Sequence, residues 1–487
     1  MAKVEVKYTK IFINNEWLNS VSGKTFATIN PTTEEKLADI QEGDKDDINK
    51  AVEAAVAAFK LGSEWRNLDA SARGRLINKF ADLIQRDIEY LARLETADNG
   101  KPYTQALGDI QFAIGGLRYY AGWADKIHGK TVPADGKVFS YTKIEPVGVC
   151  GQIIPWNYPI PMLAWKLGPA LACGNTLVVK PAEQTPLTAL YIASLVVEAG
   201  FPPGVINIVP GYGPTAGGAL VEHPNVDKIA FTGSTEVGKL IMKNGSGTLK
   251  RVSLELGGKS PLVVTKENFR CAKPRRTSLK RCALVNMGQC CAAATRTFVH
   301  ESIYDQFVNH FAQLAQKRLT MMGDPFEKDT QHGPQIDDEQ ANKILGLIES
   351  GKKEGARVVA GGKRAQRKGY FIEPTVFADV TDQMRIAREE IFGPVQQILK
   401  YKTLDEVIER ANNTTYGLAA GILTNDLNQA LKYSSSVRAG SVWVNTYLHV
   451  APQTPFGGFK QSGHEREMGE DGLKAYCEIK TVTIGLS

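Results

Sequence analysis

The sequence contains no uninterrupted apolar run of about 20 residues, the length that a membrane-spanning helix requires, although 43% of its 487 residues are apolar. The first residues lack the apolar core of a signal peptide and the arginine- and serine-rich character of a transit peptide. Cysteine is scarce, and the odd total of seven argues against a disulfide framework. We therefore expect a cytoplasmic protein with reduced thiols and no membrane partner.

Excess charge is also missing from most of the chain. The net charge is +6, but residues 266–281 hold seven lysines and arginines against one glutamate, which accounts for the whole imbalance. A nucleic-acid-binding protein carries a basic face that is distributed over its surface, so we expect no nucleic-acid partner. The chain is too long for one hydrophobic core, and two or three domains are expected.

Short apolar strands alternate with helical patterns from residue 147 onwards. The strands are predicted at 148–154, 176–179, 205–209 and 228–231, and the helices between them at 161–172, 186–199 and 214–222. This alternation predicts an α/β fold with a doubly wound, mostly parallel sheet that binds ligands at the carboxyl ends of its strands.

Further segments extend this pattern at both ends. A second alternating series includes 261–264 and 441–444, which predicts a second α/β domain. Amphipathic helices are predicted at 44–59 and 71–97, and 138–146 and 480–484 read as isolated strands outside both series.

Polar residues follow the first two predicted strands directly. Asn157 has two amide hydrogens at a strand end, where they can stabilise an oxyanion; alternatively, the side chain satisfies its own turn. Lys180 and Glu183 can bind vicinal hydroxyls such as those of a ribose. A carboxylate there favours NAD over NADP, and the alternative is an exposed ion pair on a loop.

Two more strand-end or turn motifs are weaker when taken alone. A strand, a glycine turn and a helix start surround Gly233, Ser234 and Gly238, where backbone N–H groups can bind a pyrophosphate. The spacing matches neither the dinucleotide fingerprint nor the Walker motif. Glu390 and Phe392 place a carboxylate and a ring around a turn, or mark a helix end with a core phenylalanine.

The candidate chemistry lies in a cysteine pair, Cys290 and Cys291, and in Glu255 beside two glycines. A thiol among small residues is a candidate nucleophile, and the carboxylate is a candidate base. The alternative is a pair of buried structural cysteines and a surface glutamate, because free cysteine is among the most buried residue types.

Together these motifs resemble the NAD(P)-dependent aldehyde dehydrogenase superfamily, specifically its class 1/2 cytosolic and mitochondrial branch, over nearly the whole chain. The motifs that carry the resemblance are Pro155-Trp156-Asn157, Lys180-Pro181-Ala182-Glu183, Phe231-Thr232-Gly233-Ser234, Glu255-Leu256-Gly257-Gly258-Lys259, Gly288-Gln289-Cys290-Cys291, Glu390-Ile391-Phe392-Gly393-Pro394 and Pro455-Phe456-Gly457-Gly458.

The resemblance implies a catalytic site. Cys291 would attack the aldehyde carbon, Asn157 and the Cys291 N–H would stabilise the oxyanion, and Glu255 would activate the water that hydrolyses the thioester. The implied cofactor is NAD, with binding residues Ile154, Trp156, Lys180, Glu183, Gly213, Gly233, Ser234, Gly238, Leu256, Lys343, Glu390 and Phe392. The implied substrate tunnel consists of Phe112, Trp165, Leu448, Val450 and Phe456.

The resemblance also implies a domain organisation and an assembly. Residues 1–127 and 147–257 would form the NAD-binding domain, and 258–461 the catalytic domain. Residues 128–146 and 475–487 would form a β-arm and a C-terminal strand for oligomerisation, typically into a homotetramer. The partner is then an apolar aldehyde, whether aliphatic, aromatic or retinoid-like.

One segment departs from the family pattern. Residues 266–285 place Pro274, Arg275 and Arg276 where an amphipathic helix is usual, and a proline inside a helix costs about 3 kcal/mol. The segment is either a genuine basic insertion or the result of a local reading-frame error in the sequence. We prefer the reading-frame error. Resequencing the message distinguishes the two.

Three other functions are alternatives. A crystallin-like structural protein derived from this fold would have no need to keep all the catalytic residues together, and a nucleic-acid-binding role for 266–281 lacks interleaved aromatic residues beyond Phe269. A semialdehyde dehydrogenase would need a cation in the tunnel, where Leu448 and Val450 offer none.

Overall fold

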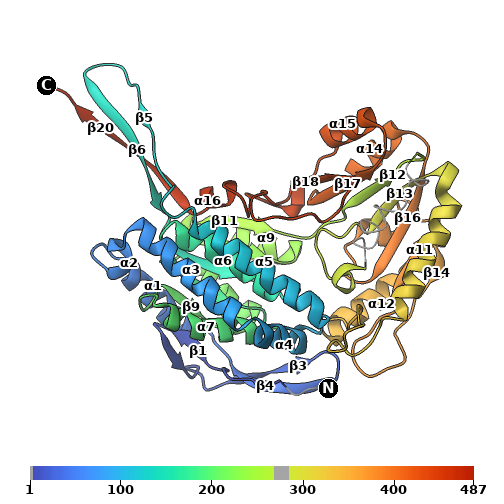
Figure 1. Ribbon diagram of the computed structural model, residues 1–487, viewed down its shortest axis with the longest axis horizontal. Coiled ribbons are helices and arrows are strands. Elements are labelled where there is room, and N and C mark those ends of the chain that lie inside the picture. The colour runs from blue at the N-terminus through green and yellow to red at the C-terminus, as the bar shows by residue number, and fades with distance from the viewer. Residues whose placement is uncertain (1–3, 268–283) are drawn as a thin grey trace.

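The computed structural model describes residues 4–267 and 284–487 (Figure 1). Its first sheet has eight strands. In spatial order the strands are β19 (Gly463–His464), β11 (Arg251–Glu255), β10 (Lys228–Thr232), β7 (Val149–Ile153), β8 (Thr176–Lys180), β9 (Ile206–Ile208), β1 (Ile11–Ile13) and β2 (Glu16–Leu18). The strands from β11 to β9 pair in parallel, whereas β19, β1 and β2 are antiparallel. The predicted mostly parallel sheet is confirmed, with antiparallel strands at both edges.

Burial explains why the central strands read as apolar runs. Every residue of β7, β8 and β10 is buried, as expected for parallel strands covered by helices on both faces. The carboxyl ends of these strands therefore meet at one edge, where the next residues form the loops of the site.

Helices cover this sheet largely where they were predicted. They are α1 (Lys45–Phe59), α2 (Glu64–Asn67), α3 (Ala70–Arg86), α4 (Ile88–Asn99), α5 (Tyr103–Ala121), α6 (Pro159–Ala172), α7 (Leu187–Ala199), α8 (Gly218–Glu222) and α9 (Thr235–Gly245). The Asp44 side chain caps α1 in a capping box with Asp47.

Two helix predictions were partly wrong. The single pattern at 71–97 is two helices, because Asp87 adopts a non-helical conformation (φ −98°, ψ 15°) between α3 and α4. The pattern at 214–222 begins as a π-helix, η1 (Gly213–Gly217), and only then continues as α8. Hydrophobic periodicity did not distinguish these breaks, because the apolar residues keep the same face across them.

The second sheet has seven strands, in the order β14 (Arg357–Ala360), β15 (Thr375–Ala378), β16 (Val395–Tyr401), β13 (Arg296–His300), β12 (Pro261–Val264), β17 (Ala419–Leu423) and β18 (Ser441–Val444). All of its strand pairs are parallel except the pairing of β14 with β15. Its helices are α11 (Tyr304–Leu319), α12 (Asp338–Lys353), α13 (Arg385–Arg388), α14 (Leu404–Asn412) and α15 (Leu427–Ser436). A second alternating α/β series is therefore present as predicted.

The two isolated strands pair with each other. β6 (Val138–Pro146) runs antiparallel to β20 (Cys477–Gly485) along nine residue pairs, and β5 (Thr131–Val132) completes a three-stranded arm. Figure 1 shows this arm extending away from the rest of the molecule.

Some features lie outside the predictions. The antiparallel pair β3 (Thr25–Asn30) and β4 (Glu35–Gln41) was not predicted. The central residues of the basic segment, 268–283, lie outside the described part of the chain. Among the described residues, no helix combines the length and the apolar character needed to cross a membrane. The division into domains stays a prediction.

Candidate active site

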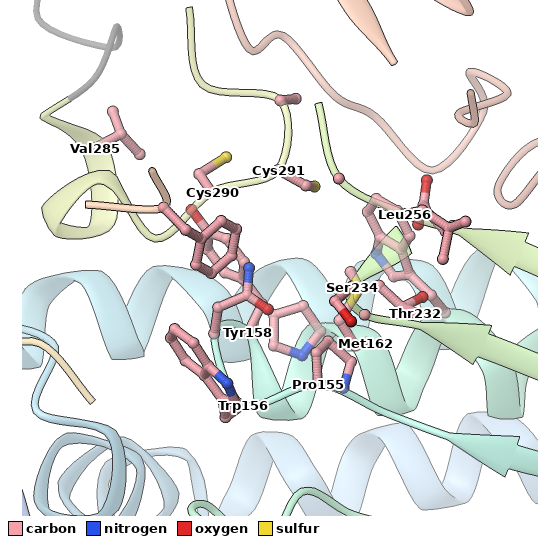
Figure 2. Close-up of a pocket in the computed structure, with 18 of the residues that line it drawn as sticks. Pro155, Trp156, Tyr158, Met162, Thr232, Ser234, Leu256, Val285, Cys290 and Cys291 are labelled. Atoms are coloured by element: carbon pink, nitrogen blue, oxygen red, sulfur yellow. The ribbon is translucent and has the colours of Figure 1, made fainter. Parts of the chain in front are cut away.

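A cavity of about 400 Å³ opens where the carboxyl ends of β7, β10 and β11 meet loops that contact the second sheet. Figure 2 shows Cys290 and Cys291 on one side of it, and Pro155, Trp156, Thr232 and Ser234 on the other. The predicted site residues that line it are Phe112, Trp156, Asn157, Trp165, Gly233, Ser234, Glu255, Leu256, Cys291, Lys343, Glu390, Phe392, Leu448, Val450 and Phe456. Segments far apart in the sequence therefore converge on one space.

The cysteine pair divides into a buried and a half-buried residue. Cys290 is 8% exposed, whereas Cys291 is of intermediate exposure, and both line the cavity. A tight turn delivers them, in which Gly288 has a φ of 76°. Any side chain at Gly288 would meet the Gly393 carbonyl at 1.9 Å, so glycine is required there. Contact with the Cys290 thiol, burial and the Glu255 carboxylate raise the pKa of Cys291, so its proton must be removed before it can attack.

Asn157 points its amide at the cysteine loop rather than at its own turn. The side chain is 5% exposed, and its Nδ2 donates to the Gln289 carbonyl at 3.0 Å. The Asn157 carbonyl accepts from Asn286 Nδ2 at 2.9 Å, and Asn286 Nδ2 also donates to the Gln289 carbonyl at 3.1 Å. The two loops are thereby fixed against each other beside Cys291.

Glu255 is the last residue of β11 and is not a surface glutamate. It is 4% exposed and lines the cavity. Burial and the neighbouring Glu467 carboxylate raise its pKa, because both factors disfavour the charged form. Glu467 pairs with the buried Lys166, whose Nζ also donates to Thr232 Oγ1 at 2.7 Å. A carboxyl with a raised pKa suits a general base that works near neutral pH.

Glu390 reaches the same cavity from the loop after α13. One of its oxygens accepts from the Gly258 N–H at 3.0 Å, and burial raises its pKa to about 7. A Cβ at Gly257 would lie 2.1 Å from the other oxygen, so the carboxylate keeps this position only while residue 257 is glycine. Phe392 packs edge-on against Trp156, with ring centroids 5.3 Å apart.

The remaining predicted cofactor residues lie outside the cavity lining: Ile154, Lys180 and Glu183 at the ends of β7 and β8, Gly213 in the π-helix after β9, and Gly238 in α9. Lys180 Nζ forms an ion pair with Glu183 at 3.1 Å. The residue Lys180 is 2% exposed, so the pair is partly buried and is not an exposed ion pair on a loop. The Ile154 N–H donates to the Lys180 carbonyl. Gly213 begins the π-helix η1. The last residue of this helix, Gly217, lies beside Lys180, because a Cβ there would be 3.5 Å from the Lys180 side chain.

These residues fit NAD by their chemistry. An ammonium and a carboxylate side by side can donate to and accept from the two hydroxyls of a ribose. Ser234 caps α9 by accepting from the Val237 N–H at 3.2 Å, and the start of this helix can hold a pyrophosphate. Gly238 lets α9 approach the site closely, because a Cβ there would lie 2.7 Å from Leu256.

The end of the cavity beyond Cys291 is aromatic and apolar. Trp165 contacts Phe112 and Phe456, with ring centroids 5.9 and 5.6 Å away, and Leu448 and Val450 complete this wall. Such a surface favours an apolar substrate.

Several polar residues of the site were not predicted from the sequence. Lys166 lies in an otherwise apolar helix, and Lys101 and Asp109 contact each other behind Asn157. A lone lysine within a fully buried helical pattern is a signal that could have identified Lys166. Glu467 offers no such signal, because its position depends on a loop far along the chain.

Comparisons with known proteins agree with this geometry. The model of the aldehyde dehydrogenase family matches residues 17–482. The chain belongs to the aldehyde dehydrogenase family. It is 60% identical to aldehyde dehydrogenase 1A1 of Bos taurus, over all of this chain and 97% of that protein. It is 59% identical to retinal dehydrogenase 2 of Homo sapiens, over 99% of this chain and 92% of that protein.

A solved structure shows the same fold. The NAD⁺ complex of an aldehyde dehydrogenase from Bacillus cereus is 48% identical and has a TM-score of 0.95, over 99% of this chain and 97% of that one. The predicted class 1/2 membership and the predicted fold are therefore confirmed.

Proposed function

We propose that this protein oxidises an aldehyde to a carboxylic acid, with NAD as the hydride acceptor. The observation that carries the proposal is the convergence of Cys291, Asn157 and Glu255 on one cavity, with Glu390 on its wall. A nucleophile, an oxyanion donor and a base are the groups that covalent aldehyde oxidation requires.

The first step starts from the thiolate of Cys291, formed when the thiol proton passes to Glu255 in the same cavity and from there to water. Its Sγ then bonds to the aldehyde carbon as the carbon–oxygen π bond breaks. The carbonyl oxygen becomes an oxyanion, which the Asn157 amide and the Cys291 N–H stabilise. Asn157 Nδ2 carries two hydrogens, and only one is needed for the Gln289 carbonyl. Loss of such a donor costs about 3–4 kcal/mol of barrier.

Oxidation and hydrolysis follow at the same carbon. Bound NAD supplies the acceptor for the hydride that leaves this carbon, and the protein is left as a Cys291 thioester. Glu255 takes a proton from water while the water oxygen bonds to the thioester carbon. The carbon–sulfur bond then breaks, the acid departs, and the thiolate of Cys291 is restored. The raised pKa of Glu255 suits this proton transfer.

The cofactor is held by residues from both sheets. We assign Lys180 and Glu183 to the adenosine ribose, and Trp156 and Ser234 to the pyrophosphate. Glu390 takes the nicotinamide ribose, and Phe392 packs near the nicotinamide ring. The remaining residues assigned to this site are Ile154, Gly213, Gly233, Gly238, Leu256 and Lys343.

The substrate is proposed to be an apolar aldehyde. The wall of Phe112, Trp165 and Phe456 is uncharged, and the nearby carboxylate of Asp109 is already paired with Lys101. One relative is named a retinal dehydrogenase. The candidates are aliphatic, aromatic and retinoid-like aldehydes. We also infer a cytoplasmic homotetramer, assembled through the arm of β5, β6 and β20, as the class 1/2 resemblance implies.

The test is NADH formation at 340 nm with acetaldehyde, a longer aliphatic aldehyde and retinal as substrates. We expect turnover with at least one of them. A folded protein that binds NAD and turns over none of them would contradict the proposal and favour the crystallin-like alternative.

A further inference from the structure

A buried lysine lies directly behind the proposed oxyanion donor. Lys101 sits in the short connection between α4 and α5, and its exposed fraction is 0%. Gly100 before it adopts a left-handed conformation with a φ of 84°, which ends α4 and turns the chain inward. The lysine side chain is thereby directed into the protein rather than towards water.

The Lys101 ammonium contacts three groups. Its Nζ donates to Asp109 Oδ2 at 2.6 Å and to the Asn157 carbonyl at 3.0 Å. It also lies 4.5 Å from the centroid of the Tyr158 ring. An ammonium without partners at such a depth would be strongly unfavourable, and this position is tolerated because its hydrogens have acceptors.

The contact with the Asn157 carbonyl matters because the side chain of the same residue carries the proposed oxyanion donor. Its carbonyl is held by Lys101 and by Asn286, and its side chain donates to the Gln289 carbonyl on the cysteine loop. The two side-chain torsions of Asn157 are limited by the hydrogen bond to Gln289, so a fixed peptide together with this bond determines where Nδ2 points. Lys101 is the charged member of this arrangement and therefore its strongest donor.

We propose that Lys101 is a positioning residue for the reaction. Its ammonium, neutralised by Asp109, holds the peptide carbonyl of Asn157 so that the Asn157 amide meets the oxyanion formed at Cys291. This inference rests on the proposed function. Lys101 is not among the residues that line the cavity, so it acts through the residues it contacts, and Asn157 is the one among them that donates to the oxyanion.

A double-mutant cycle with Lys101→Met and Asn157→Ala tests the proposal. Asn157→Ala should lower kcat/KM about 100- to 1,000-fold. Lys101→Met should lower it about 10- to 100-fold, because a misplacement of the order of 1 Å has effects of this size. In the Asn157→Ala background, Lys101→Met should cost less than about threefold more, because the donor it positions is gone.

Two further measurements separate positioning from general damage. Alkylation of Cys291 by iodoacetamide forms no oxyanion, so its rate and the Kd for NAD should stay within about threefold of wild type in Lys101→Met. The matched control is Lys126→Met, which removes an exposed lysine paired with the neighbouring Asp125 and should leave kcat/KM unchanged. If Lys101→Met does not fold, Lys101→Arg enters the same cycle, because it keeps the charge and displaces the donor.

The outcomes distinguish this inference from the proposed function. If Asn157→Ala has no effect, the oxyanion role of Asn157 is wrong. If Asn157→Ala impairs turnover but the lysine substitution has its full effect in both backgrounds, Lys101 acts independently of Asn157 and the inference is overturned. Equal losses in alkylation and in turnover would also overturn it, because they indicate a general disturbance of the site.

Discussion

The carboxyl group of Glu255 lines the active-site cavity and has the Glu467 carboxylate as its neighbour, which raises the pKa of Glu255. Lys166 forms an ion pair with Glu467 and lowers the pKa of Glu255 through its charge. The proposed base therefore belongs to a group of one ammonium and two carboxyls. Its protonation depends on a residue far along the chain.

This relationship predicts how activity depends on pH. Turnover limited by hydrolysis should rise with pH as Glu255 loses its proton, with a midpoint above the ordinary value of about 4.3 for a glutamate. Replacing Glu467 with Gln removes a negative neighbour and leaves the Lys166 charge uncompensated. Both changes lower the pKa of Glu255, so the rising limb of the kcat–pH profile should move to lower pH. A profile that stays in place would show that Glu467 does not influence the base.

The two cysteines should differ in their effect on activity. Cys291→Ala removes the half-buried thiol that lines the cavity beside Asn157, and NADH formation should be abolished. Cys290→Ala removes the more buried thiol and should leave most of the turnover. NAD binding, measured by fluorescence, serves as the control for folding in both variants. If Cys290→Ala were the inactive variant, the assignment within the pair would be reversed.

NAD binding should depend on pH through Glu390. Burial raises its pKa to about 7, and its charged form is the better acceptor for ribose hydroxyls. The Kd for NAD should therefore decrease as pH rises from 6 to 8, and Glu390→Gln should bind more weakly and remove most of this dependence. Isothermal titration calorimetry at several pH values checks the prediction, and an unchanged pH dependence in Glu390→Gln would assign it to another group.

The sequence predicted the parts of the fold that follow from local pattern. The buried strands β7, β8 and β10 appeared as apolar runs because a parallel sheet buries both of its faces. The arm strands β6 and β20 were recognised as strands outside both sheets, but their pairing joins segments more than three hundred residues apart. No local pattern contains such a pairing.

The site was predictable where motifs stand at strand ends, and less so where it depends on tertiary contacts. Asn157 and Ser234 follow strands, and Glu255 ends one, and the carboxyl ends of these strands share one edge. Lys101 and Glu467 reach the site through a helix connection and a late loop, and neither lies in a motif. The break at Asp87 was missed because helical periodicity continues on both sides of it.

A methyl group at Gly257 should disturb cofactor binding. The Cβ of Gly257→Ala would lie 2.1 Å from one Glu390 oxygen, so the carboxylate has to move away from its position beside the cavity. We expect the Kd for NAD to increase at least about tenfold, which corresponds to 1.4 kcal/mol. The matched control is Gly218→Ala, because a Cβ there meets no atom within 4 Å. Equal affinities in the two variants would show that Glu390 is not a cofactor ligand.

The arm should hold the assembly together. Ile479 is 72% exposed on β20, and in the proposed homotetramer an exposed isoleucine on the arm is a candidate contact with another subunit. Replacing Ile479 with Glu should therefore destabilise the homotetramer without changing the pairing of β20 with β6, because the backbone hydrogen bonds of the pair remain.

Light scattering should report a smaller mass for Ile479→Glu than for wild type at the same protein concentration. The control is Lys480→Gln on the same strand, which keeps a polar side chain there and loses only an exposed ion pair with Glu145, so the mass should stay unchanged. A wild-type protein that is already monomeric would contradict the proposed assembly. A tetramer that survives the Ile479 substitution would place the interface elsewhere on the molecule.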